Sequence, residues 1–251
     1  METILQSRAL LGCLLLLASV AVAIKDGTSS NACDYPGLAV ILSTKDAVIC
    51  NAVFLSSNQF IVPEICGAAM NTFLKKSALK LSYDQVPVNI TIPVGTSGVL
   101  GDGVYSFTLD TPIQNSCSSV ARVYDSKTMT LDLTTCQVVG YGAATSSSKI
   151  FDGVLNAAAV NKSTSSSCCL AIWDSLTKTE KGTTYKDASY NCLTSTGATC
   201  GTGDVGAPVY CKTDSGERVL TALTSSTPCV SGGVFLAHDL TAGATDFKFG
   251  Y

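Results

Sequence analysis

The sequence has little charge and almost no histidine, and both shortages exclude classes of function. Only 14% of its 251 residues are charged, with 16 basic against 19 acidic side chains and no block of lysine and arginine, so nothing predicts nucleic-acid binding. The one histidine is His238, and no Cys-x-x-Cys pair is present, which argues against a zinc site although cysteine is abundant. A hydrophobic fraction of 46% excludes intrinsic disorder. We expect a globular protein with no metal, no cofactor and no nucleic-acid partner.

Long apolar runs are also scarce, because only residues 9–23 form one. This run follows Arg8 and ends in the tripeptide AVA, which is typical of a secretory signal peptide cleaved after Ala23. A membrane anchor is the alternative, but the run is shorter than the roughly 20 residues that a spanning helix needs. We therefore expect residues 1–23 to be a signal peptide. The mature protein would begin at Ile24 and be secreted to the extracellular space, with no membrane partner.

Cysteine is abundant, and a secreted protein gives these residues a role. In an oxidising compartment they are most simply disulfides. Removal of Cys13 with the signal peptide leaves an odd number, so at least one thiol is unpaired or bound to another molecule. The sequons Asn89-Ile90-Thr91 and Asn161-Lys162-Ser163 predict N-glycosylation at Asn89 and Asn161 in a secreted chain.

Short runs of residues, most of them β-branched or aromatic and bounded by turn-forming residues, predict six strands. They cover residues 38–42, 48–55, 60–62, 105–109, 128–133 and 219–223. Long stretches with a helical apolar period are missing, and the best short-helix candidate is residues 169–176, which contain the only tryptophan. The pattern favours an all-β barrel or sandwich, with a join between two halves near residues 124–127.

Six short motifs stand in the order and at the approximate spacing of motifs in one protein family. They are IKDGT from Ile24 (IVGG in the family), CNAVFL from Cys50 (CGGSLI), VPEIC from Val62 (TAAHC), CQVVGYG from Cys136 (C…GWG), GDVGAP from Gly203 (GDSGGP) and GVF from Gly233 (GVY). Together they resemble the chymotrypsin-like, or trypsin-fold, serine proteases over essentially the whole mature chain. The resemblance implies an all-β fold of two six-stranded antiparallel β-barrels with little helix. The N-terminal barrel would span about residues 24–125 and the C-terminal barrel about 126–251.

The resemblance also implies a disulfide pattern. The family's pairs correspond to Cys50–Cys66, Cys136–Cys211, Cys168–Cys192 and Cys200–Cys229. A further pair, Cys33–Cys117, is suggested because Ala157 stands where trypsins have the partner of an early cysteine. Cys169 is then the odd cysteine, and it would allow a disulfide-linked dimer.

The family's catalytic groups are absent from the matched positions. Peptide cleavage by a serine protease needs a hydroxyl nucleophile, an imidazole base and a carboxylate that orients the imidazole. The matched positions hold Val205, Ile65 and Gly103, none of which can perform its role. A one-residue shift would bring Asp102 to the carboxylate position, but it would have no imidazole to orient. We expect His238, near the end of the last strand, to be an exposed surface residue far from the cleft.

Substrate recognition is altered as well. Ala198 stands where trypsins carry the aspartate of the specificity pocket, and Thr224-Ser225-Ser226 replaces the Ser-Trp-Gly strand that pairs with substrate. Residues 200–203 hold one residue more than the family's oxyanion loop. The resemblance therefore implies an inactive homologue, a pseudoprotease, rather than an enzyme.

Asp204 is the family residue that this chain keeps. In the family this aspartate pairs with the N-terminal ammonium that processing liberates, and a buried carboxylate without a partner costs several kcal/mol. We therefore expect an ion pair between the Ile24 ammonium and Asp204, formed when the signal peptide is removed. The chain would then fold directly into the ordered, active-like conformation.

The resulting expectation is a secreted, non-catalytic serine protease homologue that acts by binding another protein as a decoy, cofactor or inhibitor. The partner would be a secreted hydrolase or an immune factor. One alternative is a hydrolase with relocated chemistry, in which Glu64 and Asp102 form a carboxylate pair of the kind that glycosidases use. The other is a disulfide-linked structural or coat component.

Overall fold

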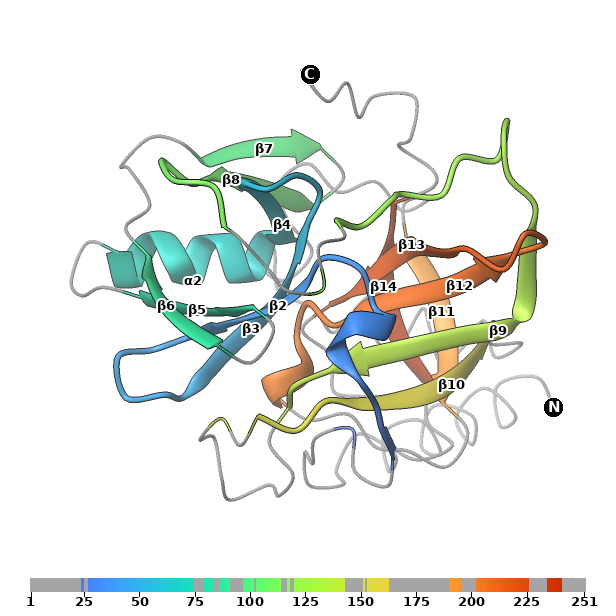
Figure 1. Cartoon of the computed structure of the whole chain (residues 1–251), viewed down its shortest axis with the longest axis horizontal. Coiled ribbons are helices and arrows are strands. Elements are labelled where there is room, and N and C mark those ends of the chain that lie inside the picture. Colours follow the sequence, from blue (N-terminus) through green and yellow to red (C-terminus); the bar gives the residue numbers. More distant parts are fainter. Residues whose placement is uncertain are drawn as a thin grey trace, which may run out of the picture.

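The described residues form two antiparallel β-sheets and one α-helix, and the two sheets lie side by side in Figure 1 with the N-terminal sheet on the left. The computed structural model describes residues 24, 27–74, 79–83, 86–90, 97–101, 103–113, 117, 120–142, 151, 153–162, 190–195, 202–225 and 234–240. Among these residues, no helix is both long enough and apolar enough to cross a bilayer.

The N-terminal sheet contains seven strands. They are β2 (Leu38–Leu42), β3 (Val48–Phe54), β4 (Gln59–Pro63), β5 (Leu79–Tyr83), β6 (Val86–Ile90), β7 (Ser97–Gly101) and β8 (Val104–Thr108). Their order in the sheet is β6-β5-β2-β3-β4-β8-β7, so the two end strands, β6 and β7, follow one another in the chain. Pro93 and Gly95 lie between them in the sequence, and both residue types interrupt strands. This sheet therefore has seven strands where six were predicted.

The C-terminal sheet closes into a barrel. Its strands are β9 (Leu131–Gly140), β10 (Asn156–Lys162), β11 (Tyr190–Ser195), β12 (Pro208–Thr213), β13 (Arg218–Thr224) and β14 (Val234–Asp239). These six form a ring because β9 pairs with β12 on one side and with β10 on the other. A short additional strand, β1 (Thr28–Ser29), pairs with β10, with Thr28 opposite Ala157. The first strand of the chain thus belongs to the C-terminal sheet.

The expected all-β fold of two antiparallel barrels with little helix is confirmed, although the number of N-terminal strands and the position of the helix differ from the prediction. The α-helix α2 (Glu64–Leu74) was not predicted, and the helix candidate at 169–176 lies outside the described residues. Strand β9 begins near the end of the predicted run 128–133 and continues to Gly140. The predicted boundary near residue 125 falls between β8 and β9, and the division into domains stays a prediction.

The two sheets share a hydrophobic core. One cluster of buried side chains joins Leu38, Val40 and Leu42 of β2 to Tyr210 of β12 and Leu220 of β13. Burial of this kind stabilises by about 25 cal/mol for each Å² of apolar surface removed from water. The cluster therefore holds both sheets together as well as stabilising each one.

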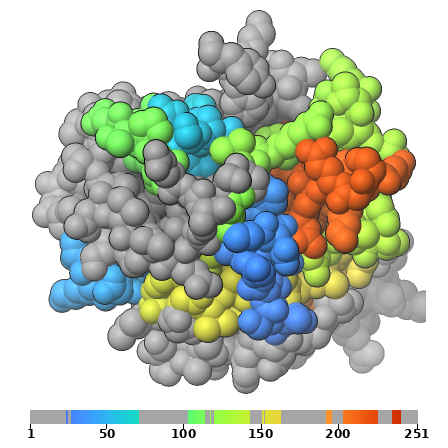
Figure 2. Space-filling model, in the orientation of Figure 1, coloured from blue at the N-terminus to red at the C-terminus, as the bar shows by residue number. Residues whose placement is uncertain are grey.

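The segment that precedes β2 lies across the C-terminal sheet. The Arg218 guanidinium donates a hydrogen bond to the Asp34 carbonyl at 2.8 Å and sits 4.3 Å from the centre of the Tyr35 ring. The Tyr35 hydroxyl in turn donates to Gln137 Oε1 on β9 at 2.9 Å. In Figure 2 this blue segment lies on the surface between the yellow residues of β10 and the orange residues of β12 and β13. Asp34 and Tyr35 are thereby fixed to the second sheet.

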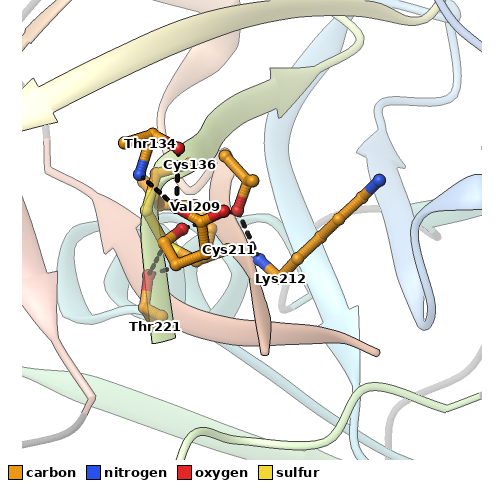
Figure 3. Close-up of a disulfide and its surroundings, with 8 residues drawn as sticks. Thr134, Cys136, Val209, Cys211, Lys212 and Thr221 are labelled. Carbon is orange, nitrogen blue, oxygen red and sulfur yellow. Dashed lines mark hydrogen bonds between the residues drawn. A yellow bond between two sulfur atoms is a disulfide. The ribbon is translucent and has the colours of Figure 1, made fainter. Parts of the chain in front are cut away.

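Disulfides reinforce both sheets and the segment that joins them. Cys50–Cys66 links β3 to α2, and Cys136–Cys211 links β9 to β12. Figure 3 shows the second of these with the Thr221 hydroxyl, which donates to the Val209 carbonyl at 3.0 Å, and with the Lys212 side chain extending away from the sulfur atoms.

Candidate functional site

Two of the three positions predicted to replace the catalytic groups meet where β4 passes into α2. Ile65 is the second residue of α2, and Gly103 immediately precedes β8. The Glu64 N–H donates to the Gly103 carbonyl at 2.7 Å, and Pro63 is opposite Val104 in the β4–β8 register. Ile65 and Gly103 are therefore adjacent in space, although they are 38 positions apart in the chain.

The third position, Val205, approaches from the other sheet. It follows the short helix η3 (Thr202–Asp204), and its carbonyl accepts a hydrogen bond from the Asn51 N–H of β3 at 2.8 Å. The next residue, Gly206, has a φ of +79°, and a Cβ placed there would come within 2.5 Å of the Asn51 carbonyl oxygen and 3.1 Å of Pro63 Cδ. The close approach and the left-handed backbone both require glycine. They hold Val205 against the middle of β3 and the end of β4.

Ile65 and Val205 pack against the same apolar cluster. Both side chains are partly buried, and the cluster that they contact includes the Cys50–Cys66 disulfide and Val62 of the N-terminal sheet. Their alkyl side chains can neither donate nor accept a proton, and Gly103 has no side chain. The structure thus gathers the three predicted positions, and their side chains offer packing rather than acid–base chemistry.

The only histidine of the chain lies elsewhere, and its predicted exposure is wrong. His238 is 3% exposed on β14, where it stands opposite Tyr190 of β11 and Leu223 of β13. A central strand is covered by its neighbours on both sides, so a polar residue on it can be buried even near the strand's end. Because the sequence holds no second histidine, no imidazole accompanies Ile65 and Val205.

The carboxylate pair of the alternative hydrolase is only partly described. Glu64 is the first residue of α2 and is 6% exposed, and Asp102 lies outside the described residues. A carboxyl group with so little exposed surface presents almost nothing to a substrate arriving from solvent. The described half of the pair therefore does not favour relocated hydrolytic chemistry.

Ile24 and Asp204 are both buried, each 2% exposed. A Cβ placed on Gly140 would come within 2.8 Å of Asp204 Oδ1 and 3.4 Å of Ile24 Cδ1, so the two side chains border the same glycine. The Gly142 N–H donates to Asp204 Oδ1 at 3.0 Å, and the Thr224 hydroxyl donates to the Asp204 carbonyl at 2.7 Å. The predicted ion pair between the Ile24 ammonium and Asp204 stays a prediction.

Asn51 is the site residue that sequence reasoning missed. It is completely buried, its amide nitrogen donates to the carbonyl of Gly203 at 3.1 Å, and its Oδ1 accepts from the Tyr141 N–H at 3.1 Å. The sequence did contain a signal, since Asn51 is the only polar residue in the strand VICNAVF. A lone amide in an apolar strand is usually hydrogen-bonded inside the protein.

Three of the predicted cysteine pairs are joined in the structure. They are Cys33–Cys117, Cys50–Cys66 and Cys136–Cys211. Cys192 is also disulfide-bonded, but Cys168, Cys169, Cys200 and Cys229 lie outside the described residues, as do Ala198 and Ser226. Glycosylation stays a prediction at both sequons: Asn161 is exposed on β10, and Asn89 lies on β6. In the described part of the chain, no three His, Cys, Asp or Glu residues are grouped as metal ligands.

The fold is that of the trypsin-like serine proteases. Among solved structures, this chain is similar to mouse neuropsin, a serine protease expressed in the limbic system of the brain, with a TM-score of 0.60. The similarity covers 88% of this chain and 97% of the neuropsin chain at 18% sequence identity, a level that establishes the shared fold alone. No protein-family model and no curated protein matches the sequence.

Proposed function

We propose that this protein is a secreted, catalytically silent relative of the trypsin-like proteases that acts by binding another protein. The observation that carries the proposal is the packing of Ile65 and Val205 on one apolar cluster, with the chain's only imidazole buried on β14. A serine protease mechanism needs a proton acceptor within hydrogen-bonding reach of its nucleophile. Aliphatic side chains at both positions remove the acceptor and the nucleophile together.

Retention of the double-barrel fold supports a binding role. The cross-sheet core and the disulfides preserve the scaffold, and a fold without catalytic groups can still present loops to a partner. Fold alone does not determine function, so the partner class rests on analogy. The partner that fits best is a secreted hydrolase or an immune factor, on which this protein would act as a decoy, cofactor or inhibitor.

The first experiment tests for turnover. The purified secreted protein is incubated with fluorogenic peptide and glycan panels and with a fluorophosphonate probe that labels activated serines. We expect neither turnover nor labelling, in contrast to an active trypsin-fold protease assayed in parallel. Peptide cleavage that co-purifies with the protein and is abolished by a variant of this chain would contradict the proposal.

The second experiment tests for binding. The protein is immobilised and used to capture partners from the extracellular fluid in which it occurs, and each partner is then measured again with both components purified. We expect at least one saturable complex with a secreted protein. A chain that binds no purified extracellular protein would contradict the proposal.

The alternative functions make different predictions for the same material. The relocated hydrolase predicts glycan turnover that Glu64→Gln abolishes, with Gln59→Leu as a control in the same sheet. The structural or coat component predicts covalent oligomers on non-reducing gels that disappear in Cys169→Ser. A monomer without turnover contradicts both alternatives.

A further inference from the structure

Asn51 connects the N-terminal sheet to the loop that contains Asp204. Its amide nitrogen donates to the carbonyls of Gly203 and Val205 at 3.1 and 3.4 Å, and its backbone N–H donates to Val205 O at 2.8 Å. An asparagine NH₂ group carries two hydrogens, so it can satisfy two carbonyls at once. The residues on both sides of Asp204 are therefore held by one buried side chain.

The acceptor end of the same amide reaches a second segment of the C-terminal sheet. Asn51 Oδ1 accepts from the Tyr141 N–H at 3.1 Å, and the adjacent Gly142 N–H donates to Asp204 Oδ1 at 3.0 Å. The Thr224 hydroxyl holds the Asp204 carbonyl at 2.7 Å from β13. Three consecutive loop residues are thus anchored to β3, to the end of β9 and to β13, and Asn51 takes part in two of these connections.

We infer that Asn51 is a positioning residue that locks the loop of residues 203–206 in one conformation whether or not Ile24 carries a free amine. Among the described residues, the hydrogen-bond partners of Asn51 are all in other segments than residue 24. The motif that Asn51 occupies has glycine at this position in the resembled family, and glycine supplies neither an amide donor nor a side-chain acceptor. The lock is therefore an addition in this chain.

Burial makes the lock strong. Asn51 is 0% exposed, so removal of its amide would take from the Gly203 carbonyl and the Tyr141 N–H the hydrogen bonds that it makes to them, with no water to replace it. The Val205 carbonyl would keep the bond from the Asn51 backbone N–H. Asp204 is buried as well, and its carboxylate is oriented by an N–H adjacent to the one that Asn51 holds. Loss of Asn51 should therefore loosen the loop locally, before the barrels themselves are affected.

Amide hydrogen exchange measured by mass spectrometry tests the inference. Four forms of the full chain are expressed for secretion: the natural sequence, Asn51→Leu, Gln59→Leu, and a form with Gly-Ser-Gly inserted between Ala23 and Ile24. Leucine has nearly the shape of asparagine but no hydrogen-bonding groups. Gln59→Leu is the matched control. It removes the hydrogen bond of 2.8 Å that the Gln59 amide donates to Ser106 Oγ in the same sheet, and it does not touch the loop.

We expect Asn51→Leu to accelerate exchange in peptides covering 203–207 by about tenfold or more, with β2 and β10 unchanged within about twofold. Gln59→Leu and the insertion should leave the loop within about threefold of the natural sequence. A merely structural role would raise exchange in all strands together. If Asn51→Leu is not secreted in folded form, Asn51→Gly, which carries the family's residue, is measured in its place.

The inference is overturned if the insertion accelerates loop exchange as much as the Asn51 variant does, since the loop would then depend on the amine. It is equally overturned if the Asn51 variant exchanges like the natural sequence or loosens every strand alike. The measurement involves neither turnover nor partner binding, so its outcome does not depend on the proposed function.

Discussion

Gly142 and Asp204 fit together because one of them lacks a side chain. The Gly142 N–H donates to Asp204 Oδ1 at 3.0 Å, and a Cβ on Gly142 would fall inside the contact distance of all the Asp204 carboxylate atoms. The carboxylate is thereby accommodated inside the protein, where Asp204 is 2% exposed. Packing against Asp204 therefore explains why residue 142 is a glycine, and this explanation does not depend on catalysis.

Gly142→Ala should destabilise the protein by about 3 kcal/mol, because the new methyl group must displace a buried, hydrogen-bonded carboxylate. Gly216→Ala is the control. A methyl group on Gly216 would meet nothing within 4 Å, but this residue has a φ of +83°, so the substitution should cost only about 1 kcal/mol, from the left-handed backbone. Urea denaturation of both variants measures the difference. Equal losses would mean that Asp204 moves aside freely.

Introducing the catalytic residues of trypsin-like serine proteases should not make this protein a protease. In Ile65→His, Gly103→Asp, Val205→Ser, the aspartate would occupy a position with a φ of +78°, which costs about 1–2 kcal/mol for a non-glycine residue. The histidine would replace a side chain packed on an apolar cluster. We expect kcat/KM below about 10 M⁻¹ s⁻¹ on a fluorogenic peptide panel, about three orders of magnitude under the lower end for ordinary enzymes. Rapid cleavage, or labelling by a fluorophosphonate, would show that the cleft is still preformed.

The disulfide that closes the longer loop should contribute more to stability. Cys33–Cys117 spans 84 residues and Cys50–Cys66 spans 16. On chain-entropy arguments, their removal by paired alanine substitutions should cost about 4.5 and about 3 kcal/mol. Denaturant unfolding of the two double variants gives the comparison. A larger loss for Cys50→Ala, Cys66→Ala would show that packing of the buried sulfur atoms outweighs the entropy of the unfolded chain.

Asp125 should make stability depend on pH only in the acid range. Hydrogen bonds from the Lys127 N–H, at 2.9 Å, and the Thr128 hydroxyl, at 3.0 Å, hold the pKa of Asp125 below its ordinary value of 3.8. A lowered pKa in the folded state gives stability that is present above pH 3.8 and is lost as the pH falls through the folded-state value. Asp125→Ala should therefore lower Tm at neutral pH.

Thermal melts between about pH 2 and pH 7 check this prediction, and the difference in Tm between the natural sequence and Asp125→Ala should shrink as the pH falls below 3.8. Asp132→Ala should behave in the same way, because the Thr134 hydroxyl and N–H lower the pKa of Asp132. A gap that is constant across the whole range would exclude linkage to the ionisation of these carboxyl groups.

Part of the fold could be predicted from the sequence because some strands are local features. β2, β3, β4, β8 and β13 match predicted runs to within one residue at each end, since β-branched and aromatic residues there are bounded by turn-forming ones. The helix α2 was missed because Gly67, Ala68 and Ala69 separate Cys66 from Met70. These small residues leave too short an apolar period to distinguish a helix.

The candidate site also has a part that could be predicted from the sequence and a part that could not. Motif order indicated where Ile65, Gly103 and Val205 stand in the chain, and the structure brings them together. The hydrogen-bond partners of Asn51 could not be predicted from the sequence. Gly203 is 152 positions away, and no local pattern identifies which carbonyls an asparagine side chain will contact. His238 was predicted wrongly for a related reason, since its burial depends on strands β11 and β13, which come from distant parts of the sequence.

The position of β1 has a consequence for the order of folding. Thr28 and Ser29 pair with Ala157 and Asn156, so residues that leave the ribosome early wait until more than half of the polypeptide has been synthesised before their ladder can form. Contacts between such remote segments are slow to form, because a long loop must close first. The second barrel therefore receives its additional strand from residues that are synthesised before the first barrel. A ribosome-bound fragment that lacks β10 will leave Thr28 and Ser29 without their strand partner.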